Sequence, residues 1–262
     1  MFSGLGGIPL TIGWQAFLIV CPLIFLGGFI DSIAGGGGLI TLPAYYLAGL
    51  PPALANGTNK LSALAGTSVA AGKYIARGHV SWRCGVASLV GSVPGASFGS
   101  FLLTRLPADY VKAGVILALP LVAFFVIKSR DLLPRKALIP ASFTLPASFM
   151  IGLLIGLYDG LVGPGTGTFL MLAYVSLMGM DALPASGTAR LVNLGSNFAS
   201  AVTMMASGHV LYLLALPAAV FGILGNYLGA SLAIARGAPY IRKLLLIVLA
   251  LLLTKLIADV IF

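Results

Sequence analysis

Residues 191–235 read LVNLGSNFASAVTMMASGHVLYLLALPAAVFGILGNYLGASLAIA and contain no Asp, Glu, Lys or Arg. This stretch is long enough for two membrane-spanning helices of about 20 residues each. The whole 262-residue chain has the same character, because 59% of its side chains are hydrophobic and only 8% are charged. Soluble domains carry about 25% charged residues, which excludes an ordinary soluble fold. Long apolar runs without polar alternation favour helices over a membrane barrel, so the sequence predicts an all-α polytopic membrane protein.

Apolar runs bounded by glycine, proline or charge predict ten helical segments. They cover residues 14–34, 36–50, 53–76, 82–103, 110–127, 139–162, 165–180, 184–207, 210–234 and 240–261. The second and seventh are short and follow glycine clusters, which is typical of half-helices or re-entrant segments as well as of full spans. The N-terminus lacks the signature of a cleaved secretory signal, so we expect the first segment to be retained.

An internal repeat divides the chain. At an offset of 130 residues, Gly57-Thr58 aligns with Gly187-Thr188 and the GHV of 78–80 with the GHV of 208–210. Upstream, an offset of 128 aligns Asp31 with Asp159. We therefore expect a first repeat at 1–127, a cytoplasmic linker at 128–138 and a second repeat at 139–262. About five segments per repeat is an odd number, which predicts inverted topology, a common architecture of secondary transporters.

The positive charge of the chain is concentrated between apolar segments. Lys and Arg cluster at 77–83, 128–136 and 236–243, whereas loop 208–210 has none. If the basic loops face the cytoplasm, both termini lie outside. The formal charge of +9 is then a topology signal, and nucleic-acid binding is not expected. Cys21 and Cys84 lack metal-ligand spacing, so we expect inert packing, with a sulfur relay as the alternative, and neither metal nor cofactor.

In each repeat an aspartate precedes a glycine-rich break, DSIAGGGGLITLP at 31–43 and DGLVGPGTGTFL at 159–170. Glycine and Pro164 disfavour a continuous helix here. The N-terminus of a helix that restarts inside the membrane offers N–H donors and positive potential to an anion. Tight helix packing through small residues is the alternative. The turn residues expected to contact substrate are Gly36, Gly37, Gly38, Gly165, Thr166 and Gly167.

The segments GTNKLSALAGTS at 57–68 and GTARLVNLGSN at 187–197 each place a cation inside an apolar run. A charge at mid-bilayer depth costs at least about 2.5–3.5 kcal/mol unless it is paired or hydrated. Helical spacing puts Arg190, Asn193 and Asn197 on one face, where they can donate hydrogen bonds to an oxyanion. The substrate-binding residues predicted in these segments are Asn59, Lys60, Thr67, Arg190, Asn193 and Asn197.

Two alternatives apply to these charged residues. Lys60 and Arg190 could instead snorkel to a membrane interface while the asparagines bond neighbouring helices. Asp31 and Asp159 could pair with the two cations, cap a helix or carry a coupling proton.

These motifs, in this order, resemble the TauE/SafE family of sulfite and organosulfur-anion exporters, also called the toluene sulfonate uptake permease family. The matching stretches are DSIAGGGGLITLP, GTNKLSALAGTS with RGHVSW, GLYDGLVGPGTGTFL, and GTARLVNLGSNFAS with SGHV, and they span nearly the whole chain. The resemblance implies a multi-pass permease of the bacterial inner membrane with a small anionic substrate such as sulfite or an organosulfonate. Arg190 departs from the family, which often has Lys there, and this changes the oxyanion geometry on offer.

We expect an exporter that works by alternating access around a central site between the repeats. An anion channel with the same electropositive pore is the alternative, and proton coupling stays open. The apolar segments contain no evident nucleophile with a base or metal-ligand cluster, so an enzyme is not expected. The sequence leaves the oligomeric state open.

Overall fold

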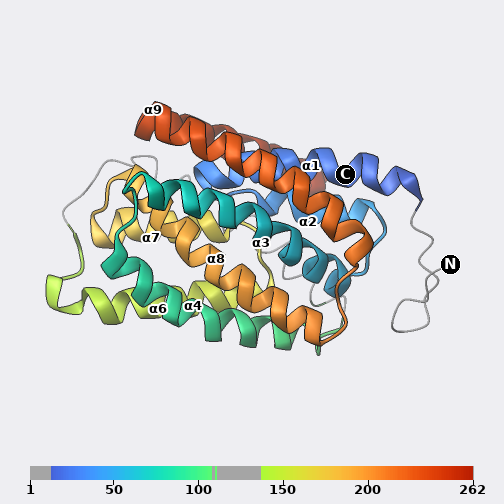
Figure 1. Ribbon diagram of the computed structural model, residues 1–262, viewed down its shortest axis with the longest axis horizontal. Helices are drawn as coiled ribbons and strands as arrows, with labels where there is room; N and C mark the ends of the chain where they lie inside the picture. Colours follow the sequence, from blue (N-terminus) through green and yellow to red (C-terminus); the bar gives the residue numbers. More distant parts are fainter. Residues whose placement is uncertain (1–12, 108–109, 111–136, 262) are drawn as a thin grey trace.

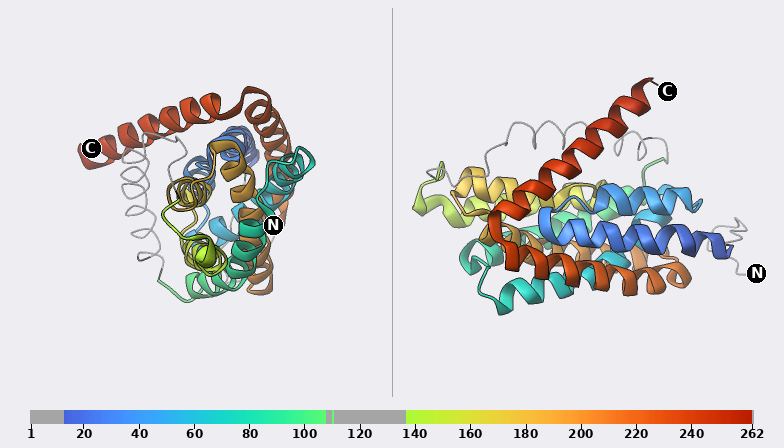
Figure 2. Two further views of the ribbon diagram at one scale, coloured as in Figure 1. Left: turned by 90° about the vertical axis from the view of Figure 1, so that its left-hand side faces the viewer. Right: turned by 90° about the horizontal axis from the view of Figure 1, so that it is seen from above.

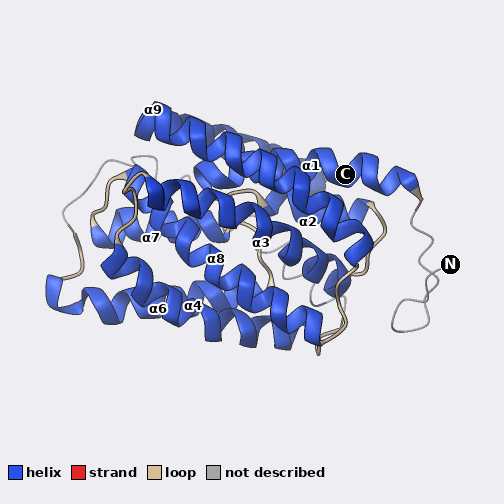
Figure 3. Cartoon of the chain, in the orientation of Figure 1, coloured by secondary structure: helices blue, strands red, loops and turns tan. Residues whose placement is uncertain are grey.

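The computed structural model of the chain describes residues 13–107, 110 and 137–261, and within these residues every regular element is helical (Figures 1 and 3). The predicted segment 110–127, apart from residue 110, and most of the linker lie outside the described residues. The helices are α1 (Trp14–Ala34), α2 (Gly38–Leu47), α3 (Pro52–Ala76), α4 (Trp82–Leu103), the 3-10 turn η1 (Ala141–Phe143), α6 (Thr144–Leu161), α7 (Thr166–Met178), α8 (Ala182–Ala206) and α9 (Tyr212–Ile261).

Two predicted segments, 210–234 and 240–261, are joined in α9. Gly237 breaks this helix with φ 69° and ψ −163°, a conformation that suits glycine, and Pro239 follows two residues later. The last part of α9 leaves the bundle at an angle (Figure 2). The sequence therefore placed this boundary correctly.

The exterior of the bundle is apolar. Within the described residues, four stretches are long and apolar enough to cross a membrane: Trp14–Ala34, Trp82–Leu103, Ala141–Leu161 and Tyr212–Gly237. Large apolar side chains such as Phe98, Leu216 and Leu224 are exposed on them. An apolar surface of this extent suits contact with lipid, and it supports a multi-pass membrane protein.

The two 25-residue helices α3 and α8 occupy the centre of the bundle and bury many of the polar side chains. They run antiparallel, because each repeat's GHV turn packs on the start of the other repeat's central helix. A Cβ on Gly57 would lie 2.0 Å from the His209 carbonyl oxygen, and one on Gly187 would lie 1.9 Å from that of His79. The neighbouring threonines complete both contacts, since Thr58 Oγ1 accepts from the Leu211 N–H at 3.1 Å and Thr188 Oγ1 from the Ser81 N–H at 2.9 Å.

The outer helices pack in parallel pairs through small residues, α1 with α9 and α4 with α6. Along α1, Phe25 meets Gly225 and Phe29 meets Gly229, so both helices advance in the same direction. Close backbone approach at small residues is how helices associate in lipid. We call the end of the bundle with the turn at Gly208 the Gly208 end, and the opposite end, with the turn at Gly78, the Gly78 end. The parallel pairing places the start of α1 at the Gly208 end and the start of α6 at the Gly78 end.

Both helical hairpins return to the end of the bundle where they start, and their second helices, with 10 residues in α2 and 13 in α7, are shorter than the roughly 20 residues of a full crossing. Both hairpins are therefore re-entrant. The α1–α2 hairpin starts at the Gly208 end and returns to it, because α3 begins there. The α6–α7 hairpin likewise starts at the Gly78 end and returns to it, because α8 begins there. A re-entrant pair restores the side on which it started, as two crossings would, so the expected sidedness of the loops is unchanged.

Candidate functional site

The turns of the two hairpins meet inside the bundle. Gly35 and Gly165 take left-handed conformations, with φ of 86° and 83°, that end α1 and begin α7. Thr168 Oγ1 donates to the Ala34 carbonyl at 3.0 Å, and a Cβ on Gly35 would lie 2.2 Å from the Gly167 carbonyl carbon. The glycines predicted to break the helices therefore also let the two turns touch.

The first of two buried ion pairs joins α3 to α6. Lys60 Nζ lies 2.7 Å from Asp159 Oδ1, and both side chains are only 3% exposed. Thr166 Oγ1 donates to the same carboxylate oxygen at 2.7 Å, and Lys60 also donates to Asn197 Oδ1 at 3.4 Å. The Asp159 Oδ2 atom has no hydrogen-bond partner among the described residues.

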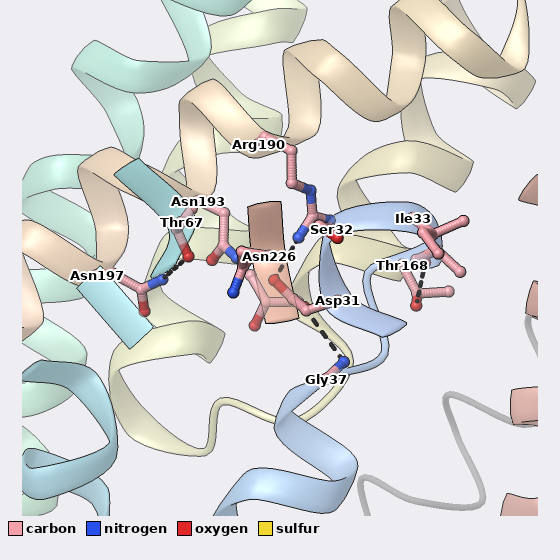
Figure 4. A network of polar contacts seen from close by, with 12 residues as sticks. Asp31, Ser32, Ile33, Gly37, Thr67, Thr168, Arg190, Asn193, Asn197 and Asn226 are labelled. Carbon is pink, nitrogen blue, oxygen red and sulfur yellow. Dashed lines mark hydrogen bonds and ion pairs between the residues drawn. The ribbon is translucent and has the colours of Figure 1, made fainter. Parts of the chain in front are cut away.

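The second ion pair joins α8 to α1. Arg190 Nη1 lies 2.5 Å from Asp31 Oδ2, with the arginine side chain 1% exposed (Figure 4). The Gly37 N–H, at the start of α2, donates to Asp31 Oδ1 at 3.2 Å. A side chain at Gly167 would overlap the Arg190 guanidinium, so this glycine makes room for the cation. Snorkelling is therefore wrong for both cations, because each is buried and paired with an acid of the other half.

A cavity of about 620 Å³, its mouth included, lies beside the hairpin turns. Its α3 lining extends from Asn56 to Thr67, the part of the helix nearer the Gly208 end. Further polar groups come from α8 and α9: the Asn193 and Asn226 side chains lie near Asp31, and Asn197 lies beside Thr67 (Figure 4). The lining is rich in amides, which offer both donors and acceptors to a small polar solute.

The structure places most of the predicted site residues around this cavity. The lining includes Asn59, Lys60, Thr67, Asn193, Asn197, Gly37, Gly38, Gly165, Thr166, Gly167, Asp31 and Asp159. Gly36 and Arg190 are not part of the lining, although Arg190 holds Asp31, which is. The pocket is not simply electropositive, because the two carboxylates balance the two cations. Whether these residues bind substrate stays a prediction.

Sequence reasoning missed two lining asparagines, Asn56 and Asn226. Both are buried, 2% and 3% exposed, and the Oδ1 atom of each has no hydrogen-bond partner among the described residues. At the repeat offset their counterparts are Ser186 and Ala96, so the repeat did not single them out. The sequence held one signal for Asn226, because a side-chain amide within the charge-free run 191–235 is costly in lipid and therefore indicates a polar contact.

The corresponding region of the other half is closed by hydrogen bonds. Tyr74 donates to the Ser32 carbonyl at 2.9 Å, and Ser186 Oγ donates to the Ile33 carbonyl at 3.0 Å. Tyr74 is fully buried, and its repeat-related position holds Met204, which is also buried but has no hydroxyl to donate. The two halves are thus not equivalent in this conformation.

An apolar exterior, re-entrant hairpins and a buried polar cavity define a multi-pass membrane protein with an internal site. Residues 20–256 match the family described as the sulfite exporter TauE/SafE, and the chain belongs to this family. No solved structure matches the chain.

The related proteins are named as membrane transporters. The chain is 40% identical to the probable membrane transporter protein ORF9 of Sinorhizobium sp., over 93% of this chain and 92% of that protein. It is 33% identical to a probable membrane transporter protein of Haemophilus influenzae, over 95% and 98% of the two chains. It is also 33% identical to the probable membrane transporter protein YfcA of Escherichia coli K12, over 96% and 91%. The chain is thus a member of a membrane transporter family.

Proposed function

We propose that this protein is a carrier that moves a small sulfur-containing anion, such as sulfite or an organosulfonate, across a bacterial inner membrane by alternating access. The observation that carries the proposal is the cavity between the two re-entrant turns, lined by Lys60 and by amides. Buried ammonium and amide N–H groups are strong donors to oxyanions. The family description supports sulfite or a related anion as the substrate.

A carrier is favoured over a channel by what lies beyond the cavity. The Arg190–Asp31 pair, the Tyr74–Ser32 hydrogen bond and the touching turns close the path toward the Gly78 end. A cavity closed on one side is the state that alternating access requires. Under the expected topology this cavity lies toward the outside of the cell.

The membrane potential gives the direction for a free anion. A negative interior favours export of a monoanion by about 2.3 kcal/mol per 100 mV. Export of sulfite or a sulfonate therefore needs no coupling ion on energetic grounds.

Flux in proteoliposomes tests the function. Purified protein is reconstituted, and the release of radiolabelled sulfite, sulfoacetate and taurine is followed. We expect saturable, temperature-steep flux with trans-stimulation for at least one of these solutes. Large single-channel currents would favour the pore instead, and the absence of flux for all three would refute the proposal.

A pair of lysine variants on one helix tests the site. Lys60→Gln should lower flux by roughly tenfold or more, since a hydrogen bond to a charged group contributes about 1.5–3 kcal/mol. Lys73→Gln is the matched control, because Lys73 lies over the Tyr227 ring and bonds Ser231, away from the cavity lining. Equal flux from both variants would remove Lys60 from the mechanism.

A further inference from the structure

The four charged groups of the two ion pairs sum to zero. Lys60 pairs with Asp159 and Arg190 with Asp31, all four from the described core of the bundle. An anion that entered this arrangement would add an uncompensated negative charge to a buried, low-dielectric space, and buried charges are stable only when paired. Loss of the charge of one carboxylate would balance the charge of a bound anion.

The two carboxylates differ in how fully they are occupied. Asp31 uses both oxygens, one for the Gly37 N–H and one for Arg190. Asp159 uses only Oδ1, which receives both Lys60 and Thr166, while its buried Oδ2 has no partner among the described residues. Asp159 and Lys60 also line the cavity together, whereas Arg190 does not. Asp159 is thus the carboxylate with an oxygen free to take a proton beside the space that an anion would fill.

We propose that Asp159 binds one proton with each anion, so that the carrier moves an anion and a proton together. The inference rests on the proposed function and adds its coupling ion. A hydronium ion of the solution on the open side gives its proton to Asp159 and leaves as water, and Lys60 keeps its charge and turns to the anion. On the other side the proton and the anion leave, and the Lys60–Asp159 pair re-forms. No charge stays unbalanced in either state.

The surroundings of Asp159 contain no other group suited to this exchange among the described residues. Lys60 of α3 and Asp31 of α1 are the other ionisable groups of the lining, and Arg190 of α8 is held by Asp31. Tyr158, beside Asp159 on α6, donates its hydroxyl to the Pro164 carbonyl at 2.5 Å. The remaining neighbours are neutral: Thr166 of α7, Asn193 and Asn197 of α8, Asn226 of α9, and Gly91, Gly95 and Gly99 where α4 packs along α6.

Coupling changes what drives transport. One proton with one monoanion carries no net charge, so the membrane potential does no work on the complex. The direction then follows the product of the anion and proton gradients, and an acidic exterior drives uptake. An uncoupled carrier or a channel would follow the potential instead.

Methanesulfonate is a suitable probe, because its charge is fixed across the biological pH range. With the purified full chain in detergent, we expect its affinity, measured by calorimetry, to rise up to about tenfold per pH unit on acidification, as for one linked proton. In proteoliposomes, an imposed acid exterior should drive methanesulfonate uptake, and an internal pH dye should report protons entering with it. A potential imposed with valinomycin should have little effect.

Two substitutions isolate the carboxylate. Asp159→Asn mimics the protonated acid, so binding should become independent of pH and pH-driven uptake should be lost, while exchange of internal for external methanesulfonate continues. Asp159→Glu retains a carboxylate and should restore the pH dependence. The glutamate variant keeps the test informative if the asparagine variant fails to fold.

The outcomes separate the two proposals. Wild-type flux that follows the potential and ignores pH, or an Asp159→Asn protein with unchanged pH dependence, overturns proton coupling and leaves the carrier intact. If methanesulfonate does not move, the same measurements are made with sulfoacetate, taurine and sulfite. Failure of all four would overturn the carrier, and the coupling with it.

Discussion

Asn197 Nδ2 donates to Thr67 Oγ1 at 3.3 Å, and these two residues are separated by the repeat offset of 130. Thr67 and its repeat-related counterpart, Asn197, therefore touch where α3 and α8 cross. Lys60 and Arg190 lie eight residues from the starts of these antiparallel helices, about 12 Å along each at 1.5 Å per residue. They consequently sit at different depths on either side of the crossing, and each meets the acid of the other half there.

The contacts between GHV turns and central helices predict a sharp difference between glycines of α3. Gly57→Ala would place a Cβ 2.0 Å from the His209 carbonyl oxygen, a backbone atom that cannot rotate away. We expect a loss of at least about 1–3 kcal/mol, as for an overpacked core. Gly187→Ala should behave alike, because its Cβ would lie 1.9 Å from the His79 oxygen. Thermal unfolding in detergent measures both.

Gly72→Ala is the control on the same helix. Nothing lies within 4 Å of a Cβ at Gly72, so alanine should leave the fold intact and stabilise α3 by about 0.5–1 kcal/mol. Equal melting temperatures for the three variants would show that the GHV contacts do not contribute to stability.

The Arg190–Asp31 pair predicts coupled losses of stability. Arg190→Met leaves the Asp31 carboxylate, whose side chain is 16% exposed, without its cation. Breaking a fully buried pair in this way costs about 3–5 kcal/mol, so the loss here should lie at or below that range. Asp31→Asn with Arg190→Met should cost less than the sum of the single changes, since neither charge is then stranded. The readout is thermal unfolding of the four proteins of this cycle. Arg105→Met is the control, because Arg105 is exposed, stacks on Phe101 and has no salt bridge among the described residues. Strictly additive losses would contradict the coupling.

Much of this architecture could be predicted because polar residues are rare in the chain and costly in lipid. The glycine breaks, the buried cations and the boundary before Gly237 each stand out against apolar surroundings, and the structure confirms that each breaks a helix or lies buried. The family match over residues 20–256 confirms the resemblance. The inverted orientation of the repeats in a membrane stays a prediction.

The pairing of charges could not be predicted. The repeat relates Asp31 to Asp159 and Lys60 to Arg190, but it is equally compatible with pairs inside each half and pairs between halves. The choice depends on the direction in which the α1–α2 and α6–α7 hairpins enter the bundle, which is a tertiary property. The asymmetry of the cavity could not be predicted either. It arises at positions where the repeat is not conserved: Ala96 is the counterpart of Asn226, and Met204 is the counterpart of Tyr74.

Alternating access predicts that repeat-related positions are exposed in turn, on opposite sides of the membrane. Asn59 lines the cavity, whereas Ala189, its counterpart at the offset of 130, is fully buried. In a background with Cys21→Ser and Cys84→Ser, an impermeant thiol reagent added at the Gly208 end should modify Asn59→Cys. Ala189→Cys should react only with reagent at the Gly78 end, and only while the carrier cycles.

Substrate should therefore change the modification rates of Asn59→Cys and Ala189→Cys in opposite directions, because the cavity at the Gly208 end closes when the path at the Gly78 end opens. Gly72→Cys, which faces open space on α3, is the control whose rate should not respond to substrate. If both site cysteines react at once with reagent from a single side, the path is a continuous pore and the channel is the better description. If Ala189→Cys never reacts while flux proceeds, no path opens at the Gly78 end beside Ala189. A mechanism in which repeat-related positions are exposed in turn is then wrong.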